Sequence, residues 1–336
     1  MKENTTSKSN NQYPAIDICK FICALLICMI HIAPFPNNKV WYFDSANFYL
    51  VNCLSRIAVP FYFASTSYFL FKKINITKID TNVIKEYCFK ILRLLGTWWV
   101  ILFVGEKNHL WYLGGAVIAI LFLTYLFKKK IKLKYIIIIT IILFIIGLLG
   151  DTYYQIIRIF KSNNILSSII ITYEKYFKTT RNGLFFGSIF VLIGIILSQK
   201  KIKIDLKLAY FLTFLSYSLL MLETTLIEKN LNPKDYNMYI SIIPIVFFML
   251  YMFLNVNIKD RPIYKKIRII SILIYFSHRM FIYLSKEIID LINIHHKINL
   301  SNYHFLFTIV LTLLFSILIE KLSRTKKLQI LKYLYS

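Results

Sequence analysis

The chain has 336 residues, 57% of them hydrophobic, and a formal net charge of +25. A soluble domain has about 45–50% apolar residues, usually in amphipathic stripes, whereas this chain has solid apolar runs such as 135–149 and 303–319. Its basic residues gather in short segments between the runs, which argues against a nucleic-acid partner and indicates a membrane protein.

Ten apolar stretches follow a polar segment, 1–15, that is expected to be disordered and cytoplasmic. That segment lacks the basic start, short apolar core and small-residue cleavage site of a secretory signal. The stretches approach the roughly 17–25 residues that cross a bilayer. We therefore expect an all-α, polytopic transmembrane helical bundle of about ten spans over 16–320, followed by a basic cytoplasmic tail over 321–336. In chain order the stretches are 16–34, 51–71, 88–104, 109–127, 135–149, 183–198, 206–222, 237–254, 267–285 and 303–319.

The orientation of the bundle follows from its basic segments. Lys and Arg are concentrated in every second segment between the apolar stretches, and most of the 41 basic residues lie there. Such an excess marks the cytoplasmic face of a membrane protein. The pattern predicts a multi-pass protein of the plasma membrane, with both termini cytoplasmic and the lipid bilayer as a partner. The oligomeric state is left open.

The longest segment on the outer side, 150–182, combines tyrosines with charged residues such as Glu174, Lys175 and Arg181. Aromatic residues with mixed charge suit a cover over a pore or cleft. They are equally typical of an interfacial aromatic belt. Both interpretations stay open at this point.

Neither the cysteines nor the adjacent histidines predict a metal site. No CxxC pair occurs, and the cysteines lie in or at the edge of apolar stretches, where they act as small hydrophobic residues. His295 and His296 lie in an outer segment without Cys or carboxylate at ligand spacing, so we expect them to be solvated. The cysteines are Cys19, Cys23, Cys28, Cys53 and Cys88.

Ionisable residues inside the apolar stretches are the candidates for function, because each costs roughly 2.5–3.5 kcal/mol at the bilayer centre. Those near the ends of a stretch reach the interface at little cost, and a histidine can sit as a neutral core residue. Arg56 and Arg93 stay charged and need a partner or water. The candidates are Asp17, Lys20, His31, Arg56, Lys90, Arg93, His109, His278 and Arg279.

Helical spacing predicts an outer pole around His31. Lys20 and His31 are eleven residues apart, which places them on one helix face within roughly 20°, about 16 Å apart along the axis. Arg56 falls at about the depth of His31, and His278 lies in the outer half of its stretch. Histidine and arginine are the residue types used for general-base catalysis and for stabilising a developing oxyanion.

The same reasoning predicts an inner, cationic pole. Lys90 and Arg93 are neighbours at i and i+3 near the cytoplasmic end of their stretch, close to Lys72 and Lys73. Lys20 lies at the same end of the first stretch. Such a pole suits a polyanionic ligand, since arginine offers bidentate contacts to phosphate.

Six short motifs along 16–283 resemble the acyltransferase-3 family of membrane acyltransferases. The first stretch has a basic residue eleven positions before a histidine, and the second reads R-I-A-V-P-F-Y-F from Arg56, with S-Y-F-L from Ser67. The first two stretches look especially like the membrane half of the vancomycin-resistance serine racemases, and no racemase domain is expected here. The remaining motifs are K-I-L-R from Lys90, H-L-W-Y-L from His109, N-G-L-F-F-G from Asn182 and Y-F-S-H from Tyr275.

The resemblance implies a membrane O-acyltransferase. Such an enzyme moves an acyl group, usually acetyl, from cytoplasmic acyl-coenzyme A to a hydroxyl of a cell-envelope polysaccharide or lipid-linked sugar, without a metal. His31 takes the place of the family's catalytic histidine, as base or transient acyl carrier, with Arg56 and His278 beside it in the catalytic group. The positions expected to bind the donor acetyl-coenzyme A are Lys20, Lys90 and Arg93.

Three departures from the family pattern bear on these roles. Lys20 and Lys90 replace arginine, which keeps the charge and loses the planar fork. Ser67 stands where glycine is usual, which is expected to crowd a close helix contact. Arg279 follows His278 where proline is common.

Two other hypotheses remain open. A transporter or exporter of a polysaccharide or small solute can use the same scaffold, and its support is the substituted basic residues and the lack of an extracytoplasmic transferase domain. A purely structural membrane protein is the third. An acyltransferase should lose activity on His31→Ala, whereas a transporter could tolerate that change.

Overall fold

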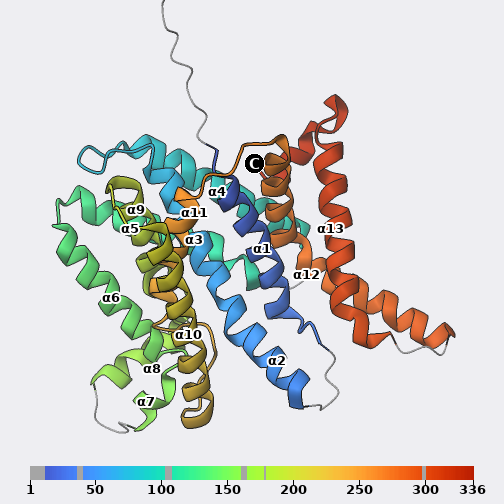
Figure 1. Ribbon diagram of the computed structural model, residues 1–336, viewed down its shortest axis with the longest axis horizontal. Coiled ribbons are helices and arrows are strands. Elements are labelled where there is room, and N and C mark those ends of the chain that lie inside the picture. Colours follow the sequence, from blue (N-terminus) through green and yellow to red (C-terminus); the bar gives the residue numbers. More distant parts are fainter. Residues whose placement is uncertain (1–11, 36–40, 103–107, 160–164, 178, 297–299) are drawn as a thin grey trace, which may run out of the picture.

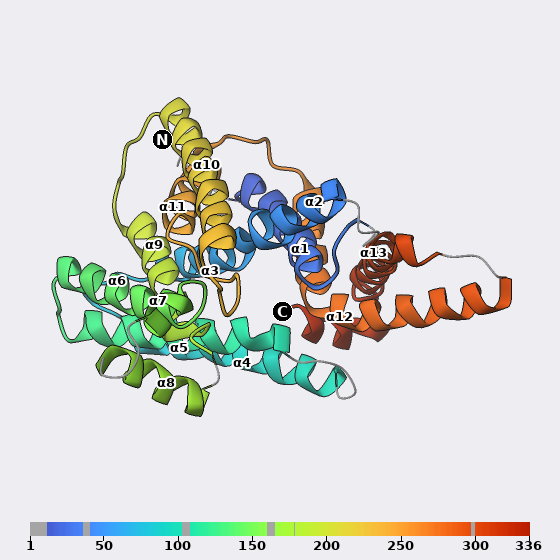
Figure 2. The same ribbon diagram turned by 90° about the horizontal axis from the view of Figure 1, so that it is seen from below.

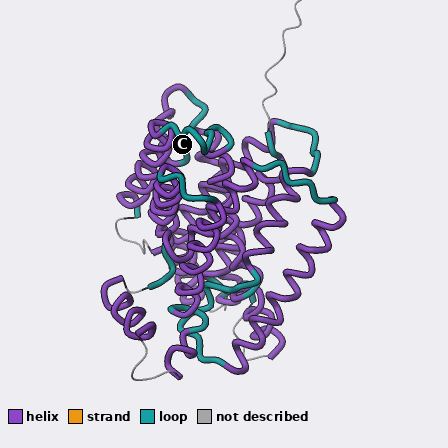
Figure 3. The backbone as a smooth tube through the Cα atoms, turned by 90° about the vertical axis from the view of Figure 1, so that its left-hand side faces the viewer, coloured by secondary structure: helices purple, strands orange, loops and turns teal. Residues whose placement is uncertain are grey.

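The computed structural model describes residues 12–35, 41–102, 108–159, 165–177, 179–296 and 300–336. In these residues the chain forms helices and connecting loops without a β-strand (Figures 1 and 3). The all-α prediction is therefore confirmed for the described chain. The α-helices are α1 (Pro14–His31), α2 (Trp41–Asn52), α3 (Ala58–Phe71), α4 (Thr81–Ile101), α5 (Trp111–Lys128), α6 (Leu133–Leu149), α7 (Tyr154–Ile159), α8 (Ile165–Phe177), α9 (Ser188–Gln199), α10 (Leu206–Asn230), α11 (Ile242–Asn255), α12 (Pro262–His296) and α13 (His304–Leu322). The short helical turns are η1 (Leu54–Ile57), η2 (Asn108–Leu110), η3 (Gly183–Gly187), η4 (Ser301–Tyr303) and η5 (Lys326–Leu334).

Each of the ten predicted apolar stretches coincides with a helix, although several helices extend beyond the predicted ends. Helix α1 begins at Pro14, inside the segment expected to be disordered, and proline suits the first turn because its missing N–H is not needed there. Residues 1–11 of that segment lie outside the described residues. The number of crossings and the sides of the two termini stay predictions.

Five helices are long and apolar enough to cross a membrane by length and composition. Much of their apolar surface faces outward: Phe214 on α10 is 72% exposed and Leu314 on α13 is 59% exposed. Helices that satisfy their own backbone hydrogen bonds and expose apolar side chains are suited to lipid. The chain is thus a membrane protein. The five segments are Pro14–His31, Trp111–Lys128, Leu206–Asn230, Pro262–His295 and Ser301–Leu322.

Helices α3 and α9 pack closely because Gly194 faces α3. A Cβ atom on Gly194 would collide with the hydroxyl of Ser67 and the carbonyl of Ala64. Ser67 Oγ donates to the carbonyl of Ala64 at 3.0 Å and to that of Val191 at 2.9 Å, so one hydroxyl joins the two helices. The expectation that Ser67 crowds a helix contact is wrong, because the opposite glycine makes room for it.

A second close approach holds the start of η3 against α5. A Cβ atom on Gly183 would collide with the carbonyl of Gly115. The side chain of Asn182 accepts hydrogen bonds from the backbone N–H groups of Leu184 and Phe185, which caps this end of the helix. Arg181, the residue before the cap, is thereby placed at a rigid helix start.

Helices α1, α12 and α13 form the other side of the bundle, and the far end of α12 projects beyond it (Figures 1 and 2). Asp17 of α1 is 4% exposed, and its two oxygens each accept a hydrogen bond of 2.7 Å from the guanidinium of Arg268 on α12. Asp17 is therefore stabilised by a bidentate ion pair rather than by reaching the interface.

The predicted basic tail folds back onto α4. The indole N–H of Trp98 donates to the carbonyl of Leu334 at 2.8 Å, and Arg93 donates to the carbonyl of Ser336 at 2.8 Å. Figure 1 shows the C-terminus at the same end of the bundle as the start of α1. The five cysteines are free and buried, as expected of small hydrophobic residues.

Substitution Gly194→Ala should destabilise the protein, since the new methyl group overpacks the contact between α3 and α9 at a cost of about 1–3 kcal/mol. The measurement is the thermal unfolding midpoint in detergent. Gly96→Ala is the control, because a Cβ atom there meets nothing within 4 Å. Equal midpoints for the two variants would contradict the close contact.

The predicted orientation can be tested with single cysteines in two exposed loops, Lys129→Cys and Asn232→Cys. A membrane-impermeant maleimide applied to intact cells should label the second and spare the first until the membrane is permeabilised. The buried native cysteines give a low background. Labelling of the variant at 129 in intact cells would reverse the orientation.

Candidate functional site

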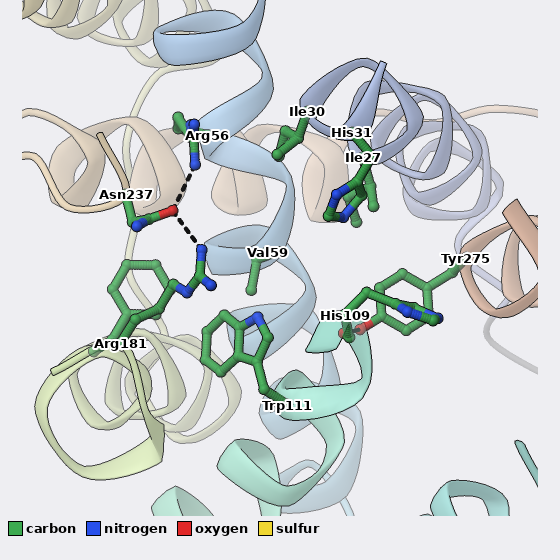
Figure 4. A pocket seen from close by; sticks show the side chains of 11 residues that line it. Ile27, Ile30, His31, Arg56, Val59, His109, Trp111, Arg181, Asn237 and Tyr275 are labelled. Carbon is green, nitrogen blue, oxygen red and sulfur yellow. Dashed lines mark hydrogen bonds between the residues drawn. The ribbon is translucent and has the colours of Figure 1, made fainter. Parts of the chain in front are cut away.

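A cavity lies where the ends of several helices meet, at the predicted outer end of the bundle (Figure 4). Water-sized spheres can occupy about 80 Å³ of its interior. Its lining is mainly apolar, and its charged and polar side chains come from α1, η1, η2, α12 and the segments that precede η3 and α11. The lining residues include His31, Arg56, His109, Arg181, Asn237 and Tyr275. We call this space the outer cavity.

Two guanidinium groups on one side of the outer cavity share a single amide oxygen. Arg56 Nη1 and Arg181 Nη1 donate to Asn237 Oδ1 at 2.5 and 2.6 Å (Figure 4). Arg56 is also held by Asn52 Oδ1 at 2.9 Å and by the carbonyl of Val51 at 3.0 Å. Each guanidinium has five N–H donors, more than these hydrogen bonds use. The pair therefore presents a positively charged, donor-rich wall to the cavity.

Asp151 fixes the orientation of that amide. Its Oδ2 accepts from Asn237 Nδ2 at 3.1 Å and its Oδ1 accepts from the backbone N–H of Asn237 at 3.0 Å. Because Nδ2 faces the carboxylate, Oδ1 must face the arginines. Burial raises the pKa of Asp151 above its ordinary value, and the hydrogen bonds from Asn237 oppose that rise. The carboxylate offsets part of the charge of the two guanidiniums from behind the amide.

Three imidazole rings stand on the opposite side of the cavity and form a contiguous group, which we call the histidine cluster: His31, His109 and His278. The ring centroids of His31 and His278 are 5.2 Å apart and nearly parallel, and those of His109 and His278 are 4.9 Å apart and nearly perpendicular. His31 and His109 line the cavity, and His278 is fully buried behind them. The predicted proximity of His31, Arg56 and His278 is thus found at this cavity.

Hydrogen bonds decide which nitrogen of each ring carries hydrogen. His278 Nδ1 donates to the carbonyl of Tyr275 at 2.7 Å, and His109 Nε2 donates to the carbonyl of Phe276 at 3.3 Å. His31 Nδ1 accepts from Arg279 Nη1 at 3.1 Å, so a neutral His31 carries its hydrogen on Nε2. Arg279, the departure from the family pattern, therefore occupies the lone pair that a general base at His31 would use.

A second cavity, which we call the inner cavity, lies toward the predicted cytoplasmic end and encloses about 960 Å³. Lys20, Lys90 and Arg268 line it, whereas Arg93 lies in a separate cleft with Ser336. The inner cationic pole is therefore only partly assembled: it brings Lys20 and Lys90 together without Arg93. A neighbouring space of about 930 Å³ shares Lys20 and adds Lys73.

A layer of three tyrosines separates the outer cavity from the inner one. The ring centroids of Tyr62, Tyr112 and Tyr275 are all 5.9 Å from one another, and all three rings line the inner cavity. Tyr275 also lines the outer cavity, and its hydroxyl donates to the carbonyl of His109 at 2.7 Å. We call these residues the tyrosine partition.

Sequence reasoning missed three parts of the site. Asn237 is neutral, so the cost of burying charge did not single it out, and Tyr275 was noted only within a motif. Arg181 was named only as a charged residue of the outer segment. Its guanidinium lies over the ring of Trp111, 5.4 Å from the centroid. The position of Arg181 favours the interpretation of that segment as a cover over a cleft.

The architecture and the outer cavity define a helical membrane protein with a charged internal site. Its sequence is 30% identical over 275 residues to an amino-acid racemase of Enterococcus faecalis, covering 75% of this chain and 37% of that protein. A second amino-acid racemase of Enterococcus faecalis is 25% identical over 336 residues, covering 92% of this chain and 46% of that protein. A serine/alanine racemase of Enterococcus gallinarum is 24% identical over 262 residues, covering 70% and 36% respectively.

The chain spans less than half the length of these curated relatives. No family model matches it, and no solved structure matches it. The predicted likeness to serine racemases of vancomycin resistance is in keeping with these relatives, whereas membership of the acyltransferase-3 family stays a prediction.

The prediction of an O-acyltransferase is wrong. The relatives are named as racemases, which are isomerases and transfer no acyl group. The predicted acyl-coenzyme A donor and envelope-glycan acceptor stay untested. The motifs misled because they describe a helical scaffold, and a scaffold does not determine the chemistry of its site.

Substitution Asn237→Ala should lower stability strongly, because it removes charge-assisted hydrogen bonds worth about 1.5–3 kcal/mol each from two guanidiniums. The thermal midpoint in detergent measures the loss, with exposed Asn232→Ala as the control. Arg56→Gln should cost less in the Asn237→Ala background than in the natural protein, since the two residues share one network. Additive losses would argue against the shared oxygen.

Proposed function

We propose that this protein is a membrane carrier for a small amino acid, with the outer cavity as its solute site. The observation that carries the proposal is the pair Arg56 and Arg181, which converge on Asn237 inside a cavity of a membrane protein. Charged residues in such a position mark a solute pathway more often than a structural feature, because their burial is costly.

A carboxylate is the ligand group that fits the arginine wall. Guanidinium groups bind carboxylates through parallel, charge-assisted hydrogen bonds. The described residues that line the outer cavity include no Asp or Glu; the carboxylate of Asp235, whose Oδ2 lies 3.9 Å from Arg181 Nη1, is half-exposed and stands outside the lining. A solute carboxylate would add negative charge inside the cavity, as Asp151 does from behind the amide.

The relatives indicate which carboxylates to consider. One of them is named for serine and alanine and two for amino acids in general. Water-sized spheres can occupy only about 80 Å³ of the outer cavity, which favours a small solute over a polysaccharide. Serine is therefore the first solute to test.

The two cavities on either side of the tyrosine partition support passage as well as binding. A carrier needs a site that is reached from one face and then from the other. The outer cavity supplies the solute site, and the inner cavity supplies an exit that Lys20 and Lys90 border. Tyr275 lines both cavities, so movement of the tyrosine partition is the step that we expect to join them.

Racemisation by this chain itself is the second candidate, because it is the activity that the relatives are named for. Moving a proton from one face of the α-carbon to the other needs acid–base groups on both sides of the solute. The imidazoles of the outer cavity all lie on one side and the arginines on the other (Figure 4). This arrangement favours binding and passage over racemisation.

The proposal is tested by counterflow: proteoliposomes loaded with unlabelled serine should take up labelled serine faster than empty ones. Chiral analysis of the released serine in the same experiment tests racemisation. Absence of counterflow for serine and alanine would overturn the carrier, and inversion of the solute would favour the second candidate.

Arg181→Gln and Arg56→Gln should each weaken serine binding at least tenfold, which corresponds to about 1.4 kcal/mol. The loss follows from removing one of two charged donors for the carboxylate. Equilibrium binding of labelled serine to the purified protein measures it, and exposed Arg261→Gln is the control. Unchanged affinity in both variants would contradict the assignment of Arg56 and Arg181 as the groups that bind the carboxylate of the solute.

A further inference from the structure

Two nitrogens of the histidine cluster are buried without a hydrogen-bond partner: His109 Nδ1 and His278 Nε2. Each ring already uses its other nitrogen as a donor to a backbone carbonyl, so each of these two presents a lone pair. A buried acceptor without a partner costs about 1–3 kcal/mol. The two rings are adjacent, with centroids 4.9 Å apart, so a proton bound to either lone pair lies within one cluster.

We propose that the histidine cluster binds one proton, on the free lone pair of His109 or of His278, and that this proton crosses the membrane together with the solute. The inference rests on the proposed carrier function and adds the ion that drives it. An N–H bond forms when water in the outer cavity gives up the proton, and it breaks when the proton passes to water on the inner side. No bond of the solute changes.

The position of the cluster suits this role. His31 and His109 line the outer cavity, and His278 lies behind them next to Tyr275. Tyr275 borders both cavities, so this residue lies between the histidine cluster and the inner cavity. The proton site and the partition between the cavities are thus linked through α12, which carries both His278 and Tyr275.

The charges around the cluster explain why proton and solute would bind together. The positive groups that face the cluster oppose protonation of its rings. A carboxylate bound to the arginine wall supplies negative charge between the arginines and the rings, which favours protonation. Binding of one therefore favours binding of the other, and the effect is reciprocal. Besides His31 within the cluster, the titratable or charged groups that face it are Arg56 of η1, Arg181 before η3, and Tyr275 and Arg279 on α12.

The test compares two assays on the same proteoliposomes: serine counterflow, which needs no gradient, and net serine accumulation driven by a proton gradient with the outside acidic. We expect accumulation that a protonophore abolishes, together with acidification of a pH dye trapped inside. Counterflow without gradient-driven accumulation or acidification would overturn the proton site. That result is the one expected if the cluster binds only water. Absence of counterflow would overturn the proposed carrier and the coupling with it.

His278→Gln keeps a polar side chain and cannot carry the proton. It should lower accumulation at least tenfold more than it lowers counterflow. His304→Gln is the matched control, because that ring bonds to the carbonyl of Ile282 at the contact between α12 and α13 and lies outside the cavity lining. Equal losses in both assays for His278→Gln would assign the residue to packing and overturn its role. Wild-type acidification tests the proposal even if the variant does not fold.

Discussion

The structure depends on one amide oxygen that accepts hydrogen bonds from two arginines. Guanidinium groups remain charged at any physiological pH and are costly in a low-dielectric interior. Asn237 makes both tolerable because Asp151 holds the other end of its amide. The contact joins η1, the segment before η3 and the segment before α11, which lie far apart along the chain. The proposed binding of a carboxylate and the assembly of the outer end of the bundle therefore involve the same four side chains.

The helices could be predicted because lipid leaves the backbone little choice: its polar groups must pair within the segment, and long apolar runs then become helices. The ends of the helices could not be predicted as well. Helix α12 continues past residue 285 to His296, because residues beyond the apolar core can extend a helix into water without cost to its hydrogen bonds. The short helices α7 and α8 gave no apolar signal of span length.

The site could be predicted in part, for a geometric reason. Depth along a helix follows from residue number, so His31, Arg56 and His278 were expected at one level, and they line or border one cavity. The direction in which a side chain points depends on which neighbour its helix packs against. Lys90 faces the inner cavity, whereas Arg93, three residues on, contacts the C-terminal residue instead. Arg279 shows the same limit, since its contact with His31 required the packing of α1 on α12.

The tyrosine partition has a consequence for the electrical behaviour of the protein. With water in both cavities, the membrane potential falls mainly across the layer of protein between them, which includes the tyrosine partition. Moving one elementary charge through the whole potential is worth about 2.3 kcal/mol per 100 mV. A charge that crosses this layer experiences most of that energy over a few ångströms. Any conformational step that carries net charge past Tyr275 should therefore be strongly voltage-dependent, whereas steps confined to either cavity should not.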